Sequence, residues 1–204
     1  MSRKKAIHAH YEPRISPDRE HHEILDWADS ASQQARFEAL IRHVDLAGKS
    51  LLDVGCGLGD LWAFCQKRRI PVDYTGVDLI EKMVAAARQK HPAVRFVHAD
   101  VFAENPFEPG SFAVVFCSGT FNLRLGNNQE FLAVALERLL EIARETVAFN
   151  LLHRRAAQRH GHCFYYDPDE VRRLLERFPC DGTIHDDYLP NDFTVICRKR
   201  PAGR

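Results

Sequence analysis

Short apolar runs alternate with segments of helical periodicity from residue 50 onward. The run "FAVVFCSGT" is apolar at nearly every position, as strands in the middle of a parallel sheet are, because both of their faces are buried. Residues 128–143 instead place apolar side chains at helical spacing, with charged side chains opposite. The predicted strands span 50–54, 72–79, 94–100, 112–120 and 146–152, and the predicted helices span 58–67, 81–90 and 128–143.

The alternation stops after a further helix, whose start is signalled by "DPDE". Asp167 is the expected cap, Pro168 suits the first helical position, and Glu170 would complete a capping box. Two strands at 182–188 and 193–198 are then joined by "LPND", which predicts a hairpin. Strands that alternate with helices predict a parallel α/β sheet, to which the hairpin adds one antiparallel strand.

The region before the first predicted strand divides into two parts. Residues 28–44 form an amphipathic helix pattern, whereas residues 8–22 are polar and interrupted by prolines. With few apolar residues, segment 1–23 cannot pack a core of its own, and we expect a disordered end or a lid that closes over a ligand. Residues 1–47 are therefore predicted to be an arm and helix that cap the domain formed by residues 48–204.

Composition and charge narrow the class of protein. The 204 residues are 45% apolar with no run long enough to span a membrane, and the first ten lack the apolar stretch of a secretory signal. Lys plus Arg equals Asp plus Glu at 28 each, so nucleic acid is disfavoured as a partner, although "RKRPAGR" is basic. Six cysteines without a CxxC pair indicate a reduced, cytoplasmic protein.

The segment "SLLDVGCGLGDL" carries the most specific chemistry. A tight turn without a ligand would explain its glycines, but a glycine-dense turn after the first strand is the usual ligand site of such a sheet. A dinucleotide site requires G-x-G-x-x-G, and here the third glycine comes one residue early, at Gly59, with Asp60 in its place. A carboxylate there repels a pyrophosphate. Together with Asp53 it favours a positively charged ligand, such as a sulfonium with an ammonium group.

Later strand ends add two more carboxylates. Asp78 follows the glycines by about twenty residues, where an acidic side chain accepts from both hydroxyls of a ribose. A helix-capping aspartate is the alternative, and one side chain can fill both roles. Asp100 ends the third strand, where it can accept from an adenine amino group. Ser118 and Gly119 end the fourth strand, so the order of these signals is more specific than any one of them.

The segments "LLDVGCGLGD", "YTGVDLIEKMVAAAR" and "VRFVHADVF" resemble the successive motifs of class I S-adenosylmethionine-dependent methyltransferases, over about residues 50–122. The resemblance implies a Rossmann-like, seven-stranded, mostly parallel sheet with a C-terminal antiparallel hairpin and helices on both faces. It also implies S-adenosylmethionine as methyl donor and S-adenosylhomocysteine as product. The expected donor-binding residues are Asp53, Gly55, Cys56, Gly57, Asp60, Asp78, Leu79, Met83, Asp100, Val101, Ser118 and Arg36.

Within that set, Asp53, Gly55 and Gly57 would meet the methionine end of the donor, and Asp78 would hold its ribose. Asp100 and Val101 would frame the adenine. Arg36 or Gln33 would bind the methionine carboxylate, although a solvated helix face explains these two residues equally well.

Methyl transfer from a sulfonium is an in-line displacement from an activated donor, so a general base is needed only if the acceptor must lose a proton. The catalytic residues are therefore unknown. The candidates are Asn122 and His153, which follow the fourth and fifth strands, and Tyr11 in the arm. Asn122 orients a polar acceptor or ties the loop to its own backbone.

The run "HGHCFYY" offers two histidines and a cysteine within four residues. A metal site generally needs a fourth ligand and different spacing, so we predict no metal. We expect the aromatic residues Phe164, Tyr165 and Tyr166 partly to pack the core and partly to line the pocket.

A methyltransferase acting on a small molecule is the favoured function, as a monomer or a homodimer. The alternatives are a methyltransferase acting on RNA or protein, and a protein that binds S-adenosylmethionine without turnover. An aminopropyl transferase would require further acidic residues along a polyamine channel, which the sequence does not reveal.

Overall fold

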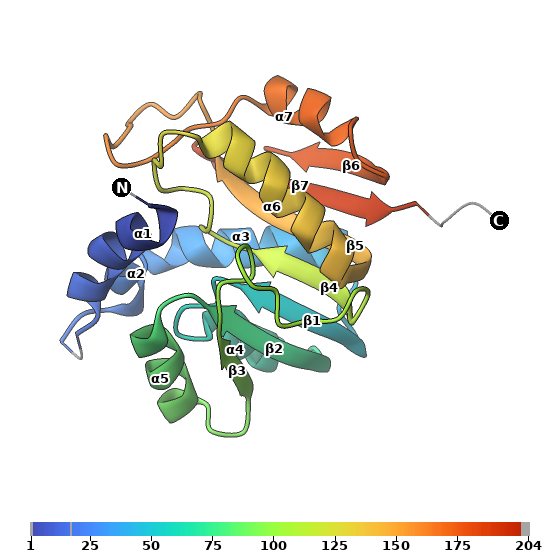
Figure 1. Cartoon of the computed structure of the whole chain (residues 1–204). Coiled ribbons are helices and arrows are strands. Elements are labelled where there is room, and N and C mark those ends of the chain that lie inside the picture. The colour runs from blue at the N-terminus through green and yellow to red at the C-terminus, as the bar shows by residue number, and fades with distance from the viewer. Residues whose placement is uncertain (1, 17, 201–204) are drawn as a thin grey trace.

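The computed structural model describes residues 2–16 and 18–200, and within them seven strands form one sheet (Figure 1). The order across the sheet is β3-β2-β1-β4-β5-β7-β6. Strands β1 to β5 pair in parallel, and β7 runs antiparallel to both of its neighbours. The predicted fold class is confirmed. The strands are β1 Lys49–Val54, β2 Val72–Asp78, β3 Arg95–His98, β4 Phe112–Cys117, β5 Ala143–Leu152, β6 Cys180–His185 and β7 Asp192–Lys199.

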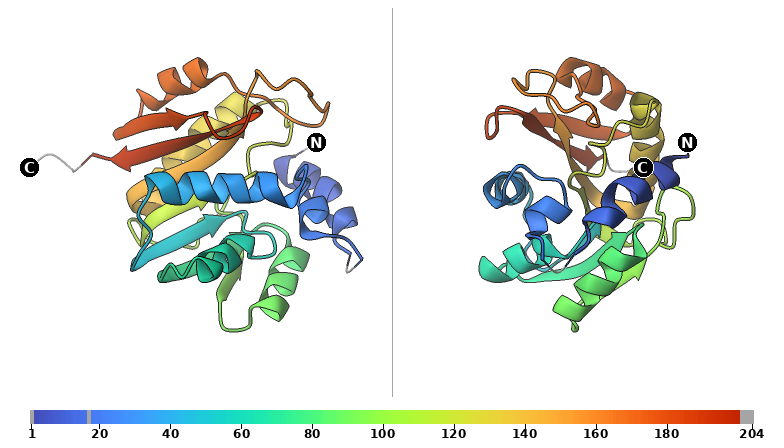
Figure 2. Two further views of the ribbon diagram at one scale, coloured as in Figure 1. Left: turned by 180° about the vertical axis from the view of Figure 1, so that it is seen from behind. Right: turned by 90° about the vertical axis from the view of Figure 1, so that its left-hand side faces the viewer.

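Helices cover both faces of the sheet (Figures 1 and 2). Helices α6 (Asn128–Ile142) and α7 (Pro168–Leu175) pack on one face, and α3 (Ser30–His43), α4 (Asp60–Lys67) and α5 (Glu81–Lys90) on the other. Successive side chains of β4 alternate between the two layers: Val115 and Cys117 pack with α6, and Val114 and Phe116 with α3 and α4. Both faces of this strand are therefore buried, which explains its uninterrupted apolar run.

Several element boundaries differ from the prediction. β5 begins at Ala143, directly after α6, where the sequence placed the end of the helix. Asp167 caps α7 as expected, but it accepts from the Asp169 backbone N–H at 2.9 Å. The predicted capping box is wrong because the Glu170 side chain is instead bonded to Arg154.

The region predicted to be a disordered end or a lid contains helices. α1 spans Arg3–Tyr11, a 3₁₀ turn spans Glu12–Arg14, and α2 spans His21–Ile24. The described residues 2–16 and 18–27, here called the N-terminal cap, lie across the carboxyl ends of the parallel strands (Figure 2). The few apolar side chains of the cap are enough to order it because they pack against apolar side chains of the rest of the domain. Its apolar residues Ile7, Tyr11, Ile15, Ile24 and Leu25 form one cluster with Leu58, Ile80, Met83 and Ala86.

Helix α3 belongs to the main core, because Phe37 and Leu40 pack with the sheet. The proposed division of the chain at residue 47 stays a prediction. Among the described residues, no helix has the length and apolar character needed to cross a bilayer.

Candidate active site

The glycine loop joins β1 to α4 at the point where the order of strands reverses, between β1 and β4. Open α/β sheets bind their ligands at such switch points, outside the carboxyl ends of the strands. Gly55, Gly57 and Gly59 all have left-handed backbones, with φ of 77°, 53° and 80°. Residues other than glycine are strained in this conformation, which explains why the loop has glycine at these three positions.

The predicted donor-binding residues converge on one cavity of about 120 Å³ at this switch point, here called the donor cavity. Every predicted residue except Arg36 lines it. These residues are Asp53, Gly55, Cys56, Gly57, Asp60, Asp78, Leu79, Met83, Asp100, Val101 and Ser118. Four of them carry carboxylates, so the wall of the donor cavity is strongly acidic.

Asp78 is fixed by two backbone donors. Its Oδ2 accepts from the Gly57 N–H at 2.9 Å, and its Oδ1 accepts from the Ile80 N–H at 2.8 Å. Burial raises the pKa of Asp78, and these two hydrogen bonds partly oppose the rise. Each carboxylate oxygen has a second lone pair, so Asp78 can still accept from ribose hydroxyls.

Asp53 lies deeper, only 4% exposed, and accepts a hydrogen bond from the Tyr74 hydroxyl at 2.7 Å. Burial raises the pKa of Asp53 to about 7, against the effect of the Tyr74 hydrogen bond and with the help of the charges of Asp78 and Asp60. The group therefore titrates near neutral pH in the free protein. A cationic ligand nearby would favour its charged form.

Asp60 begins α4 and is held by side chains from three other segments. Gln33 Nε2 donates to Oδ2 at 3.2 Å, and His21 Nδ1 and Lys90 Nζ lie 2.7 Å and 3.4 Å from Oδ1. Burial alone would raise the pKa of Asp60, but the hydrogen bond and charge of His21, with the charge of Lys90, lower it overall. Its negative charge is thus already partly balanced by the cap and by α5.

Side chains of the cap occupy part of the donor cavity. A Cβ at Gly57 would lie 2.6 Å from Leu25 Cδ2. Arg3 pairs with Asp100, and its guanidinium lies 5.5 Å and 5.1 Å from the ring centres of Phe102 and Phe131. Arg3 therefore takes the position at which the adenine is expected. These contacts explain why the donor cavity is small compared with most small-molecule sites, which have about 300–1,000 Å³.

A second cavity of about 510 Å³ adjoins the first and is here called the acceptor cavity. Its wall comes from the cap, from α3, from the loops that follow β4 and β5, and from the turn that precedes β7. The residues that line both cavities are Tyr11, Leu25, Trp27, Gly119 and Leu123. The two spaces are therefore neighbours across a single wall.

Two of the three catalytic candidates line the acceptor cavity. Tyr11 lies in the shared wall, and burial, followed by the charge of Asp26, raises the pKa of its hydroxyl, which stays protonated at neutral pH. Asn122 Oδ1 is buried and has no hydrogen-bond partner among the described residues. Ser118 Oγ is in the same state at the donor cavity. A buried polar atom without a partner is costly, which suits a position that a ligand satisfies.

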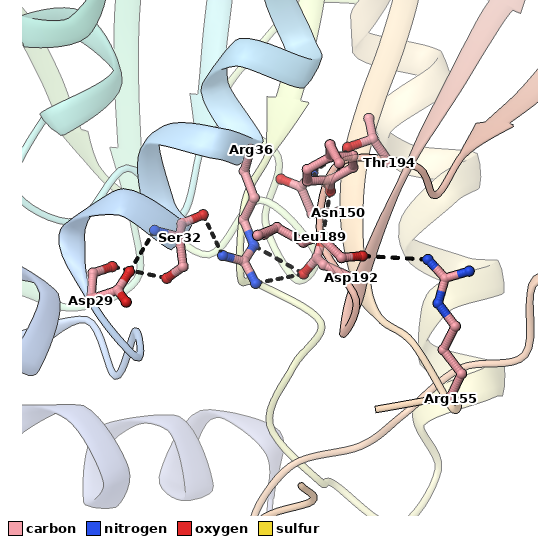
Figure 3. Close-up of polar contacts among 9 residues, drawn as sticks. Asp29, Ser32, Arg36, Asn150, Arg155, Leu189, Asp192 and Thr194 are labelled. Atoms are coloured by element: carbon pink, nitrogen blue, oxygen red, sulfur yellow. Dashed lines mark hydrogen bonds and ion pairs between the residues drawn. The ribbon is translucent and has the colours of Figure 1, made fainter. Parts of the chain in front are cut away.

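Arg36 lies at the acceptor cavity instead of the donor cavity. Its Nη2 and Nε donate to Asp192 Oδ2 at 2.7 Å and 2.9 Å, and its Nη1 donates to the Ser32 carbonyl at 2.6 Å (Figure 3). The Trp27 ring centre lies 4.3 Å from its guanidinium carbon. The structure therefore does not place Arg36 at the donor cavity, where it was expected. The buried Asp192 binds its charge, and Gln33 and Phe37 are the α3 residues that line the donor cavity.

His153 lines neither cavity as described. Its Nδ1 accepts from the Arg155 N–H at 3.0 Å, and its ring packs edge-on against Phe193. Burial lowers the pKa of His153. These contacts with Arg155 and Phe193 hold the side chain in place, which argues against His153 as a catalytic residue.

Arg3, Leu25 and Trp27 are among the site residues that were not singled out from the sequence. Trp27 was the most visible of them, since a tryptophan in a polar segment often marks a buried contact. Their positions depend on how the cap packs against the ends of the strands, and no local sequence pattern predicts that packing.

The sheet order, the glycine loop and the acidic strand ends define a Rossmann-like protein that binds a cofactor at its switch point. The family described as methyltransferase domain matches residues 51–146. Rv1506c of Mycobacterium tuberculosis, which its name classes among the methyltransferases, is 31% identical over 161 residues, covering 74% of this chain and 93% of that protein.

Two further comparisons agree. The demethylmenaquinone methyltransferase of Chlorobaculum tepidum is 33% identical over 147 residues, which cover 69% of this chain but 56% of that protein. The magnesium protoporphyrin IX methyltransferase of Synechocystis PCC 6803, solved with bound S-adenosylmethionine, superposes with a TM-score of 0.67 at 15% identity and covers 98% of each chain. The chain belongs to the class I S-adenosylmethionine-dependent methyltransferases.

The residues at the donor cavity fit S-adenosylmethionine. The glycine loop admits a ligand close to the backbone, Ser118 Oγ awaits a partner, and the carboxylates suit a ligand with two positive charges and several donor groups. In the geometry described here, Leu25 and Arg3 must shift to admit it.

Proposed function

We propose that the protein transfers the methyl group of S-adenosylmethionine to a small molecule held in the acceptor cavity. The observation that carries this proposal is the shared wall, because in-line transfer requires the donor and the acceptor to meet at one opening. The volume of the acceptor cavity falls within the range of small-molecule sites. The names of two relatives, which state a demethylmenaquinone and a porphyrin, also favour a small acceptor.

S-adenosylmethionine supplies a methyl group on a sulfonium, which needs no further activation. The chain contributes alignment and exclusion of water. Tyr11 and Trp27 provide an aromatic surface between the cavities, and Asn122 Oδ1 offers a hydrogen-bond acceptor. We expect a substrate with an apolar body and one N–H or O–H group that reaches Asn122.

The cap is proposed to act as the lid of this site. Leu25 and Arg3 fill the place of the donor, so loading requires the cap to move away, and closure over the bound donor excludes water. The expected location in the cytoplasm and the monomeric or dimeric state stay predictions.

The test uses S-adenosylmethionine with a labelled methyl group and a cell extract separated into small molecules, protein and RNA. We expect label in the small-molecule fraction. Asp78→Ala should reduce it by weakening donor binding, whereas Asn122→Ala should reduce it while S-adenosylhomocysteine binds as it does to the wild type. Label in protein or RNA would contradict this proposal and indicate a methyltransferase that acts on a macromolecule. No label in any fraction, with donor binding intact, would indicate a binding protein.

A further inference from the structure

Three side chains of the types that bind metals lie close together where the cap contacts the loop that follows β5. His10 Nε2 and His162 Nε2 lie 2.9 Å and 3.0 Å from the same oxygen of Asp26, and the three ligand atoms lie within 4.8 Å of one another. His10 comes from α1, Asp26 from the end of the cap, and His162 from the "HGHCFYY" segment. The sequence offered no further ligands near that segment, and the fold supplies Asp26 from 136 residues away and His10 from still further along the chain.

The backbone around each ligand is held in place. Asp26 adopts a left-handed conformation with φ of 60°, which is uncommon for residues other than glycine and tends to occur at functional sites. Arg14 joins the two cap ligands, since its Nη1 donates to the His10 carbonyl at 2.9 Å and its Nη2 to Asp26 Oδ1 at 3.3 Å. Arg124 holds the third ligand by donating from its backbone N–H to the His162 carbonyl at 2.7 Å.

Two imidazole nitrogens around one carboxylate oxygen admit two interpretations. Both rings donate a proton to Asp26, or both are deprotonated at Nε2 and share a cation with the carboxylate. The second arrangement has the ligand set of catalytic zinc sites and of other divalent transition-metal sites, with three protein ligands and a remaining open position. All three side chains line the acceptor cavity, where such an open position can be filled.

We propose that His10, Asp26 and His162 bind a divalent transition-metal cation, with Zn²⁺ as the best match to two imidazoles and a carboxylate. The cation would fasten the cap to the loop after β5 and thereby close one side of the acceptor cavity. Contacts from Arg14 to the far oxygen of Asp26 and to the His10 backbone have the character of outer partners that orient metal ligands. The charge of Arg14 opposes the cation, so the site is weaker than a structural zinc site.

The experiment titrates the full chain, freed of metal by a chelator, with Co²⁺ followed by visible absorption and with Zn²⁺ followed by calorimetry. We expect saturable binding of one equivalent. His162→Ala and Asp26→Asn should weaken it more than tenfold, because even outer partners of metal ligands change affinity by about 10- to 100-fold.

His160→Ala is the matched control, since this exposed histidine lies in the same loop with its ring centre 5.7 Å from that of His162. It should bind Co²⁺ as the wild type does. No saturable Co²⁺ binding by the wild type, or an equal loss in His160→Ala, would overturn the proposal and leave a hydrogen-bonded cluster. Binding of S-adenosylhomocysteine by each variant separates this result from the proposed function, because the donor cavity contains none of these residues.

Discussion

The two neighbouring cavities differ in how they are built. The donor cavity is formed mainly by residues at the ends of consecutive strands, which the sheet brings to one edge whatever the loops do. The acceptor cavity is formed by the cap, by α3, by the loops after β4 and β5 and by the turn before β7, which come together only in the finished fold. Strand ends thus line the cavity proposed for the cofactor, whereas the cap and loops line the cavity proposed for the acceptor, and loops are the segments that commonly carry specificity in a shared fold.

The difference extends to electrostatics. At the donor cavity Asp53 is buried and Asp78 is half-buried, and neither is bonded to a cationic side chain among the described residues. Desolvation raises the pKa of both carboxyl groups. Asp192, behind the acceptor cavity, is bonded to the Arg36 guanidinium. In the first arrangement no protein cation compensates the carboxylates, so a cationic ligand would favour their charged form. In the second arrangement the charge of Asp192 is compensated within the protein.

Arg36→Met should give the largest effect. Removing one partner of a buried ion pair leaves Asp192 uncompensated, which lowers the free energy of unfolding by about 3–5 kcal/mol. Denaturant unfolding measures the change, and Arg42→Met, an exposed arginine of the same helix, should change stability by less than about 0.5 kcal/mol. At a temperature where the variant is folded, its affinity for S-adenosylhomocysteine should equal that of the wild type. A large loss of affinity for S-adenosylhomocysteine would indicate that Arg36 does bind the donor.

Asp78→Ala should weaken binding of S-adenosylhomocysteine by about 2–3 kcal/mol, because hydrogen bonds to a charged group contribute about 1.5–3 kcal/mol. Calorimetry measures the affinity. Asp73→Ala is the control, since Asp73 is an exposed aspartate of the same strand. Equal affinities of the two variants would show that the Asp78 carboxylate does not hold the ribose.

The pH dependence of stability should identify Asp53. Its pKa is raised from 3.8 to about 7 in the fold, so the folded state holds a proton that the unfolded state has lost. Asp53 therefore destabilises the free protein progressively as pH rises from about 4 to 7. Asp53→Asn should remove this slope, raising the Tm of the free protein at pH 8 but not at pH 4, and it should weaken donor binding. An unchanged slope would assign the neutral-pH titration to another group.

Arg3→Ala should give the smallest effect. The Arg3–Asp100 pair is partly exposed, and such pairs contribute about 0–1 kcal/mol. Faster hydrogen exchange of α1 in the free protein is the expected result, with Lys4→Ala, an exposed neighbour, as the control.

Addition of S-adenosylhomocysteine should change the hydrogen exchange of residues 7–15 if the cap is a lid. Identical exchange of these residues with and without S-adenosylhomocysteine would exclude a lid.

Much of the donor cavity could be predicted from the sequence because its signals are local. The glycines reveal their left-handed turn, and Asp78 and Asp100 each follow an apolar strand. Arg36 could not be assigned in this way, because the side chain that binds it, Asp192, lies 156 residues later. The packing of the cap could not be predicted for a related reason, since Ile7 and Tyr11 are too few to suggest a core until Leu58 and Met83 complete it.

A crystal structure with bound S-adenosylhomocysteine tests most directly whether the two cavities form one transfer site. We predict the ribose at Asp78, the adenine near Asp100 in place of the Arg3 guanidinium, and the sulfur directed at the wall of Tyr11 and Gly119, toward the acceptor cavity. Binding of the product within the acceptor cavity, or a sulfur directed away from the shared wall, would contradict the assignment of donor and acceptor sides.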